Sequence, residues 1–394
     1  MNTTLRLKIA LAFFAFIMIG ANDGAFGVLL PSISAHYKVD NATIGFYFLA
    51  STAGYFMATF NNGLLIEKLG YRRFLALGAL IFLLSIGTIS LMPPFFILLT
   101  CSLLLGAGVA MLDAGLNTYI AALPNNTTQL NYLHAFYGIG AWLGPVVASG
   151  VLAIQWGWNS VYWIWGGMSL AVLLGFAAIF KERVPALKGE TRAESNIFIA
   201  TLRLRIVWLA AFFLLVYVGS EVSLGTWSFS LLTKERHGSL LISGWIVSGY
   251  WFGLTLGRLV MGKFSQKIGD RRLIEGSLVG VVISLLLIWW GPNAFVSAAG
   301  LWIAGFCLGP IFPTTIALMS NMVTSRVLGG AIGFMTSLGS MGAALFPWVA
   351  GNLAQHLGLW SLLPFVMILS VCMLGLWFAL QRQPEAAPAP EKLG

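Results

Sequence analysis

The stretch GLLIEKLGYRR, from Gly63 to Arg73, recurs 199 residues later in similar form as GKFSQKIGDRR, from Gly262 to Arg272. The same shift pairs identical residues over a longer region. These pairs are Gly45 with Gly244, Gly54 with Gly253, Gly63 with Gly262, Lys68 with Lys267, Gly70 with Gly269, Arg72 with Arg271 and Arg73 with Arg272. Identities at one fixed offset indicate an internal duplication. The chain is therefore predicted to consist of two related halves.

Long apolar segments surround both copies of this stretch. The 394-residue chain is 58% hydrophobic and only 9% charged, whereas an ordinary soluble domain carries roughly 25% charged residues. A membrane-spanning helix needs about 20 apolar residues. The segments that meet this requirement are 9–31, 43–66, 74–92, 95–122, 130–154, 161–180, 206–232, 242–265, 273–291, 293–320, 328–353 and 359–380. They predict an all-α membrane protein with twelve transmembrane helices.

One long polar segment, KERVPALKGETRAESNIFIATLRLR, separates the two sets of six spans. We therefore expect an N-terminal six-helix bundle at 1–180, a cytoplasmic linker at 181–205 and a C-terminal six-helix bundle at 206–380. The tail 381–394 is rich in Pro and Ala, which predicts disorder. Because an even number of spans separates the copies, the repeats are expected to be parallel and related by an axis along the membrane normal.

The positive charges are distributed unevenly between the two sides of the predicted membrane. Nineteen of the 22 Lys and Arg residues fall on the side of the chain termini. By the positive-inside rule this distribution puts both termini in the cytoplasm of a cell whose inner (plasma) membrane holds the protein. The formal net charge of +9 thus comes from basic residues in the loops between spans. A nucleic-acid-binding face, which needs clustered basic residues and stacking aromatic residues, is not expected.

The repeated stretch resembles the loop signature of the major facilitator superfamily. In that family glycines allow a tight turn between close-packed helices, and charged side chains form ion pairs at the cytoplasmic face. The resemblance implies a cytoplasmic gate made of Gly63, Glu67, Gly70, Arg72, Arg73, Gly262, Gly269, Arg271 and Arg272. Gln266 stands in the second copy where the first has Glu67, so we expect weaker ion pairing there.

Further strings are similar to the fucose-galactose proton symporter branch of this superfamily. They are LLP at Leu29–Pro31, LDAGLN at Leu112–Asn117, LNYLHAFYGIG at Leu130–Gly140 and IFPT at Ile311–Thr314. This resemblance implies sugar-like solutes, proton coupling and the major facilitator fold. Two positions depart from the branch. Its first-helix acid would fall at Gly27, one turn after Asp23, and its helix-5 Gln and Asn correspond to His134 and Tyr137.

Three carboxylates lie well inside predicted spans, namely Asp23, Asp113 and Glu221. A charge near the bilayer centre costs at least about 2.5 kcal/mol, so such acids are functional candidates. No Lys or Arg is expected at comparable depth, because Arg258 is predicted to extend toward the loop charges at the cytoplasmic end of its span. Low dielectric favours the protonated form of an unpaired acid, as a proton carrier requires. With His134, these acids are the predicted proton-coupling groups.

Amide and aromatic side chains near these acids are candidates for solute binding. Asn117 follows Asp113 by four residues and shares its helix face, and Asn22 precedes Asp23. Sugars stack their C–H faces on aromatic rings, which adds Tyr137, Trp142, Trp227, Tyr250 and Trp251. Each acid could instead form only structural hydrogen bonds, and each aromatic could serve packing or the membrane interface.

The sequence thus predicts a secondary active transporter that moves a small polar solute, with sugar-like chemistry, by proton-coupled alternating access. The expected partners are the solute, protons and the bilayer, with the protein acting as a monomer. The sequence contains no phosphate-binding loop of the Gly-x-x-x-x-Gly-Lys-Ser/Thr type. ATP is therefore not expected to be the direct energy source. We expect neither an enzyme, a cofactor nor a metal site, because matched catalytic or ligand sets are missing from the spans.

Two alternatives stay open at this point. The string GAWLGPVVAS at Gly140–Ser149 partly resembles a signature of proton-coupled drug exporters in the same superfamily. It favours export of drugs or metabolites, although its small residues could equally serve close helix packing. A membrane receptor of the same fold without transport is the other alternative, and solute flux in proteoliposomes would distinguish it from a carrier.

Overall fold

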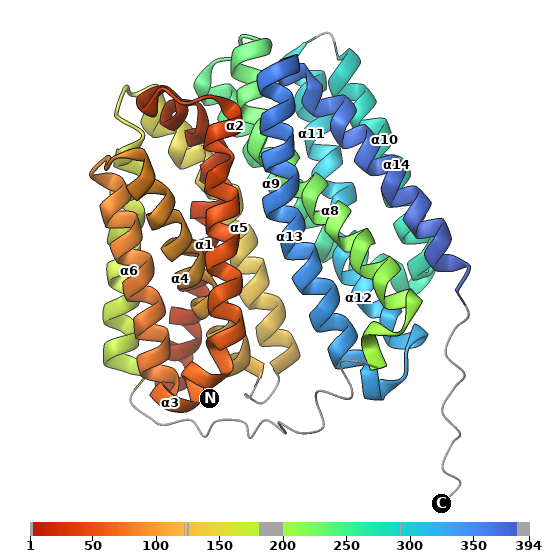
Figure 1. Cartoon of the computed structure of the whole chain (residues 1–394), viewed down its shortest axis with the longest axis horizontal. Coiled ribbons are helices and arrows are strands. Elements are labelled where there is room, and N and C mark those ends of the chain that lie inside the picture. Colours follow the sequence, from red (N-terminus) through yellow and green to blue (C-terminus); the bar gives the residue numbers. More distant parts are fainter. Residues whose placement is uncertain (1–2, 122, 124–125, 181–199, 292, 384–394) are drawn as a thin grey trace, which may run out of the picture. The chain divides into compact units, whose positions relative to one another are not determined.

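The structure is a computed structural model that describes residues 3–121, 123, 126–180, 200–291 and 293–383. These residues are predominantly helical, because the bilayer core offers a backbone no hydrogen-bond partner outside its own helix. The helices are α1 (Thr3–Tyr37), α2 (Asn41–Ile44), α3 (Phe46–Ser90), α4 (Phe95–Ala121), α5 (Asn126–Ala153), α6 (Asn159–Ile179), α8 (Arg205–Ser230), α9 (Leu240–Ile268), α10 (Asp270–Trp290), α11 (Ala294–Leu308), α12 (Ile311–Met322), α13 (Ser325–Leu357) and α14 (Leu362–Gln381), with the π-helix η1 (Leu231–Glu235) and the 3-10 helix η2 (Leu359–Ser361) (Figure 1).

Eleven helical stretches of the described residues are long and apolar enough to cross a membrane. One of them, Asn41–Ser90, has 50 residues. At 1.5 Å per residue it would measure about 75 Å, more than twice the roughly 30 Å of a hydrocarbon core. Its backbone leaves helical geometry at Gly70, so it contains two spans. The described residues therefore contain twelve spans, and the predicted all-α membrane fold is confirmed.

The repeat is visible in the backbone at two glycines. Gly70 has φ 73° and ψ 158°, and Gly269 has φ 84° and ψ 146°. This region of backbone space is essentially open only to glycine. The two residues differ by the 199-residue shift found in the sequence. Both copies of the loop motif thus adopt the tight turn that the repeated glycine predicts.

Replacing Gly70 by alanine is expected to destabilise the protein by about 1–3 kcal/mol, because alanine is strained in this backbone conformation. Gly269→Ala is expected to have the same effect. The matched control is Gly276→Ala in α10, where an added Cβ would have nothing within 4 Å. Thermal unfolding of the purified protein in detergent measures the difference. Equal melting temperatures for Gly70→Ala and Gly276→Ala would contradict the prediction.

Contacts between Cα atoms divide the described residues into two compact units. The first comprises those within Met1–Leu187, Gly225–Phe252 and Pro347–Ser361. The second comprises those within Lys188–Leu224, Gly253–Phe346 and Leu362–Gly394. Helices α8, α9 and α13 each contribute one part to each unit. Of the predicted linker and tail, residues 181–199 and 384–394 lie outside the described residues.

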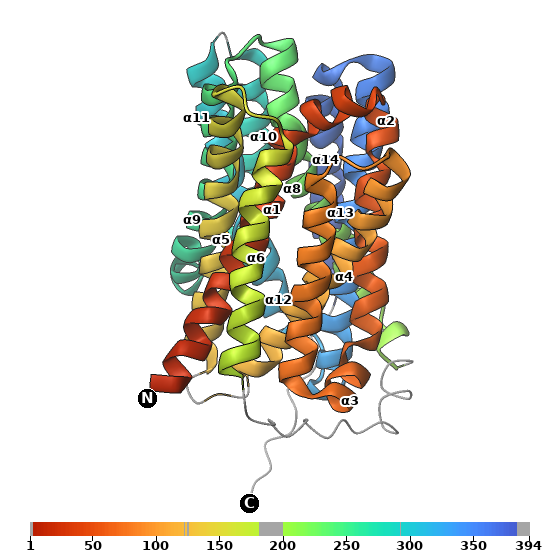
Figure 2. The ribbon, with the colours of Figure 1, turned by 90° about the vertical axis from the view of Figure 1, so that its left-hand side faces the viewer.

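Glycines bring α1 and α5 of the first unit into direct backbone contact. A Cβ at Gly20 would lie 2.1 Å from the carbonyl oxygen of Tyr137, and a Cβ at Gly144 would lie 2.3 Å from that of Ala21. Small residues spaced by four let membrane helices approach in this way. The two helices run side by side in both views (Figures 1 and 2). Residues next to these glycines, such as Asp23 on α1, are thereby held against α5.

The same kind of contact joins α3 to α4 in the first unit and α9 to α11 in the second. A Cβ at Gly54 would lie 1.8 Å from the carbonyl oxygen of Leu103. A Cβ at Gly253 would lie 2.4 Å from the carbonyl oxygen of Trp302. Both members of the second pair are shifted by 199 residues from the first. The duplication therefore extends from single residues to a specific helix–helix contact.

The span predicted at 293–320 is interrupted in the second unit. Helix α11 ends at Leu308 and α12 begins at Ile311. A Cβ at Gly309 would lie 2.4 Å from the carbonyl oxygen of Leu254, and Pro310 has no amide hydrogen to continue the helix. Around this break, α10 packs against α11, α12 and α14.

Candidate functional site

Asp113 lies inside α4 and is held by side chains from neighbouring turns and helices. The hydroxyl of Tyr55 on α3 donates to Asp113 Oδ2 at 2.9 Å. The amide Nδ2 of Asn117 donates to Asp113 Oδ1 at 2.8 Å and to the Asp113 carbonyl oxygen at 3.0 Å. His134 on α5 is exposed and interacts electrostatically with the carboxylate. The hydrogen-bond donors are uncharged, so they orient the carboxylate without neutralising it.

Asp23 on α1 has a similar set of partners. The hydroxyl of Tyr137 on α5 donates to Asp23 Oδ2 at 3.0 Å, and Asn22 Nδ2 donates to Oδ1 at 3.3 Å. Asp23 is exposed although its neighbours Asn22 and Gly24 are buried. An acid facing acyl chains is costly, so exposure at this depth indicates a water-accessible surface. Asp23 also interacts electrostatically with Asp113.

The glycine contacts between helices explain how these groups come together. Tyr55 follows Gly54, which touches α4. Asp113 lies about two turns after Gly106, whose Cβ would lie 1.9 Å from the carbonyl oxygen of Ser51 on α3. We call the resulting group, drawn from α1, α3, α4 and α5, the acid cluster: Asn22, Asp23, Tyr55, Asp113, Asn117, His134 and Tyr137.

The third intramembrane acid, Glu221, belongs to the second unit and has a cationic partner. Arg258 Nη2 on α9 lies 3.2 Å from Glu221 Oε1 and 3.3 Å from Oε2. The hydroxyl of Tyr217, one turn earlier on α8, also donates to Glu221. The expectations that Glu221 has no basic neighbour and that Arg258 reaches the loop charges are therefore wrong. Counting residues from the ends of straight helices misjudged the relative depth of these two side chains.

Segments of the second set of spans pack on the first set inside the first unit. Ser248 on α9 donates its hydroxyl to the carbonyl oxygen of Trp142 on α5 at 2.7 Å. A Cβ at Gly27 on α1 would lie 2.6 Å from the carbonyl oxygen of Thr226 on α8. A Cβ at Gly351 on α13 would lie 2.6 Å from that of Asn41. These contacts hold parts of α8, α9 and α13 against α1, α5 and the start of α2 within the first unit.

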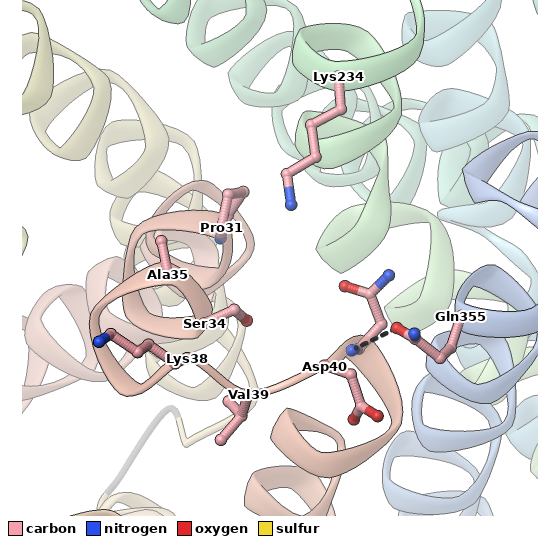
Figure 3. A pocket seen from close by; sticks show the side chains of 9 residues that line it. Pro31, Ser34, Ala35, Lys38, Val39, Asp40, Lys234 and Gln355 are labelled. Carbon is pink, nitrogen blue, oxygen red and sulfur yellow. Dashed lines mark hydrogen bonds between the residues drawn. The ribbon is translucent and has the colours of Figure 1, made fainter.

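A surface pocket of about 470 Å³ lies where α1 leads into α2 (Figure 3). It is lined by Pro31, Ser34, Ala35, Lys38, Val39, Asp40, Asn41, Lys234 and Gln355. The amide of Asn41 donates to Gln355 Oε1 at 3.1 Å, which ties α2 to α13. Hydrogen bonds from Thr43 to the Asp40 side chain lower the pKa of that carboxyl. The pocket includes no member of the acid cluster.

Comparison with known proteins identifies the family of this fold. The sequence profile of the Major Facilitator Superfamily matches residues 12–236 and 209–393, which is nearly the whole chain. The chain belongs to the Major Facilitator Superfamily. It is a membrane transporter of that superfamily and not an enzyme.

Three known proteins are similar to this chain over most of its length. Bypass of stop codon protein 6 of Saccharomyces cerevisiae is 25% identical, covering 90% of this chain and 78% of its own. The 3-(3-hydroxy-phenyl)propionate transporter of Escherichia coli is 26% identical, covering 89% and 88%. The glucose/mannose transporter GlcP of Bacillus subtilis is 20% identical, covering 85% of each chain.

Solved transporter structures share the fold over nearly the whole chain. The nucleoside transporter NupG matches with a TM-score of 0.79 and 17% identity, covering 96% of this chain and 99% of that one. The E. coli fucose:proton symporter FucP matches with a TM-score of 0.65 and 16% identity, covering 98% and 100%. The predicted resemblance to a fucose symporter is thus confirmed at the level of the fold.

Gly27 shows why this major facilitator lacks an acid at that position of its first helix. A side chain there would collide with the backbone of Thr226, as described above. Asp23, one turn earlier, instead lies where Tyr137 and Asn22 can bind it. The glycines of the exporter-like string, Gly140 and Gly144, pack on α1. Close packing therefore accounts for these two glycines.

The aromatic residues predicted to bind solute lie in different surroundings. Trp227 is 1% exposed and donates its indole N–H to the carbonyl oxygen of Pro347 at 2.9 Å. Tyr250 is completely buried and packs edge-on against Trp251, which is also buried. The rings of these three residues are covered by other side chains, so a solute cannot stack on them in this conformation. Trp142 is partly exposed beside Phe252, and Tyr137 is part of the acid cluster.

The residues predicted as a cytoplasmic gate surround the two glycine turns. Glu67, Arg72, Arg73, Arg271 and Arg272 are exposed. Gly63 lies in α3 with nothing within 4 Å of an added Cβ, and Gly262 lies in α9. Gly70 and Gly269 make the turns themselves. Their role as a gate stays a prediction.

Sequence reasoning missed Tyr55, Tyr217 and the pairing of Arg258. Tyr217 precedes Glu221 by four residues, the same spacing that linked Asp113 with Asn117, so it could have been found. Arg258 lies inside an apolar segment, which is itself a signal. Tyr55 has no such signal, because its partner lies on another helix.

Proposed function

We propose that this major facilitator moves a small polar solute with sugar-like chemistry across the inner membrane together with protons, by alternating access between two six-helix repeats with cytoplasmic termini. The observation that carries the proposal is the acid cluster, in which two intramembrane carboxylates are bound by neutral hydroxyl and amide groups. The printed names of GlcP and FucP, a sugar transporter and a sugar:proton symporter, support the solute class.

Proton coupling follows from the charges of the acid cluster. Asp23 and Asp113 interact electrostatically, and two negative charges in a low-dielectric site repel each other. Uptake of a proton by either carboxylate relieves this repulsion. Tyr55 and Tyr137 can donate to the charged acid and accept from the protonated one, since a hydroxyl does both. His134, exposed beside Asp113, provides a group through which a proton reaches the cluster.

Alternating access requires one end of the transport path to be closed at a time. The contacts of α8, α9 and α13 with α1, α2 and α5 inside the first unit supply such a closure. They include backbone contacts at glycine residues. Helices joined by such contacts can separate without leaving an unpaired charge buried in the membrane. We infer that these contacts open when the transporter turns its site to the other side.

The test is uptake of labelled glucose, fucose and their acid and phosphate derivatives into proteoliposomes with an imposed pH gradient. Accumulation of at least one solute is expected only while the gradient stands, and a protonophore should abolish it. Na⁺-dependent accumulation would overturn the proton coupling. Binding in detergent without flux of any solute would favour a receptor instead. Transport of the solute in the outward direction only would indicate export.

A further inference from the structure

The ion pair in the second unit indicates which chemical class of solute this transporter recognises. We propose that Arg258 binds an anionic oxygen group, a carboxylate or a phosphate, on a hydroxylated solute. The inference rests on the proposed transport function for the solute's route, and it adds the charge of the solute to that function. It assigns a binding role to Arg258 that its predicted place among the loop charges did not suggest.

The two members of the ion pair differ in how far water can reach them. The Glu221 side chain is 11% exposed, whereas the Arg258 side chain is 37% exposed. Arg258 lies well inside the 29-residue helix α9. A guanidinium in contact with acyl chains is strongly disfavoured, so its exposed part is expected to face water. A solute in that water therefore reaches the guanidinium of Arg258 before the carboxylate of Glu221.

The carboxylate of Glu221 has partners on two helices. Nη2 of Arg258 on α9 contacts both of its oxygens. Tyr217 also donates to Glu221, so this carboxylate keeps a partner if the guanidinium turns toward a solute. Arginine suits such a role because it stays charged and its planar fork matches carboxylate and phosphate groups.

Stability alone does not explain a charged pair at this depth. Replacing a buried ion pair by apolar side chains is often neutral or stabilising, so the pair has a better explanation in recognition. The unloaded pair carries no net charge. A bound monoanion would leave one negative charge, which one co-transported proton would neutralise. An acidic solute therefore fits proton symport without further charged groups.

The experiment compares three probes that share one sugar ring: glucose, glucuronate and glucose 6-phosphate. Ligand-induced thermal stabilisation of the purified full chain reports binding without requiring transport. Glucuronate, glucose 6-phosphate or both are expected to raise the melting temperature of the wild type more than glucose does. In Arg258→Gln the apparent affinity for the charged probe is expected to fall roughly tenfold or more. Arg258→Lys should retain part of it.

Two further variants make the result decisive. The double variant Arg258→Gln with Glu221→Gln removes both charges, so it tests the inference even if Arg258→Gln alone does not fold. Arg236→Gln, outside the spans, is the matched control and should bind like the wild type. A response to glucose equal to that of both charged probes, no response to either charged probe, or undiminished binding in the double variant would each overturn the inference.

The outcomes also separate this inference from the proposed function. Proton-driven uptake of glucose that Arg258→Gln leaves unchanged would sustain proton-coupled sugar transport and refute the role of Arg258. Arg258-dependent binding of glucuronate without proton-driven uptake of any probe would sustain the anion site and refute proton coupling. A preference for glucuronate indicates a sugar acid, and a preference for glucose 6-phosphate indicates a sugar phosphate.

Discussion

Asp113→Asn is expected to abolish proton-driven accumulation of the solute while leaving its exchange across the membrane. Asparagine has nearly the same size and can still accept a hydrogen bond from Tyr55, but it cannot take up a proton. For one coupled proton, a gradient of two pH units supplies about 2.7 kcal/mol, or roughly hundredfold accumulation. The variant should bring internal and external concentrations to about the same value. Uptake into proteoliposomes, with counterflow exchange measured in parallel, checks both parts.

The matched control is Asp40→Asn, which changes the same side chain outside the spans. The Asp40 carboxylate accepts a hydrogen bond from the Thr43 amide at 2.7 Å at the start of α2. Asparagine caps a helix about as well as aspartate, so folding should be unaffected. The hydrogen bonds from Thr43 lower the pKa of Asp40, so this acid stays charged at neutral pH. Accumulation by Asp113→Asn equal to that by Asp40→Asn would refute the coupling role of Asp113.

The parts of the fold that depend on local or periodic features could be predicted from the sequence. The number of spans followed from the length of apolar segments, which the bilayer thickness fixes. The turns at Gly70 and Gly269 followed from a glycine repeated at the 199-residue offset. Asn117 was placed beside Asp113 because four residues make about one helical turn. In each case the information lies within one segment or in a comparison of two copies.

Contacts between different helices could not be predicted in the same way. Several spans are apolar on every side, so they lack the amphipathic pattern that shows which face a residue occupies. Depth was estimated by counting residues along helices taken as straight and upright, whereas membrane helices tilt by about 20° on average. For this reason Arg258 was assigned to the membrane surface although it touches Glu221. The partnership of Tyr55 with Asp113 depends on helix rotation and was missed.

Gly54→Ala is expected to cost about 3 kcal/mol, at the upper end of the range for overpacking. The added Cβ would lie 1.8 Å from the carbonyl oxygen of Leu103, a backbone atom that no rotamer change can move away. Helices α3 and α4 must therefore separate. The control in the same helix is Gly87→Ala, where an added Cβ has nothing within 4 Å. There alanine should stabilise the helix by about 0.5–1 kcal/mol. Thermal unfolding in detergent compares the two variants.

The repeat gives this prediction a second test, and the acid cluster gives it a functional consequence. Gly253→Ala should destabilise the protein in the same way, because its Cβ would lie 2.4 Å from the carbonyl oxygen of Trp302 in the duplicated contact. Only Gly54→Ala displaces Tyr55 and with it a hydrogen bond to Asp113. When uptake is expressed per amount of folded protein, the Gly54 variant should therefore lose more proton-driven accumulation than the Gly253 variant. Equal transport losses in the two variants would mean that the α3–α4 contact supports the fold alone and does not position the acid cluster.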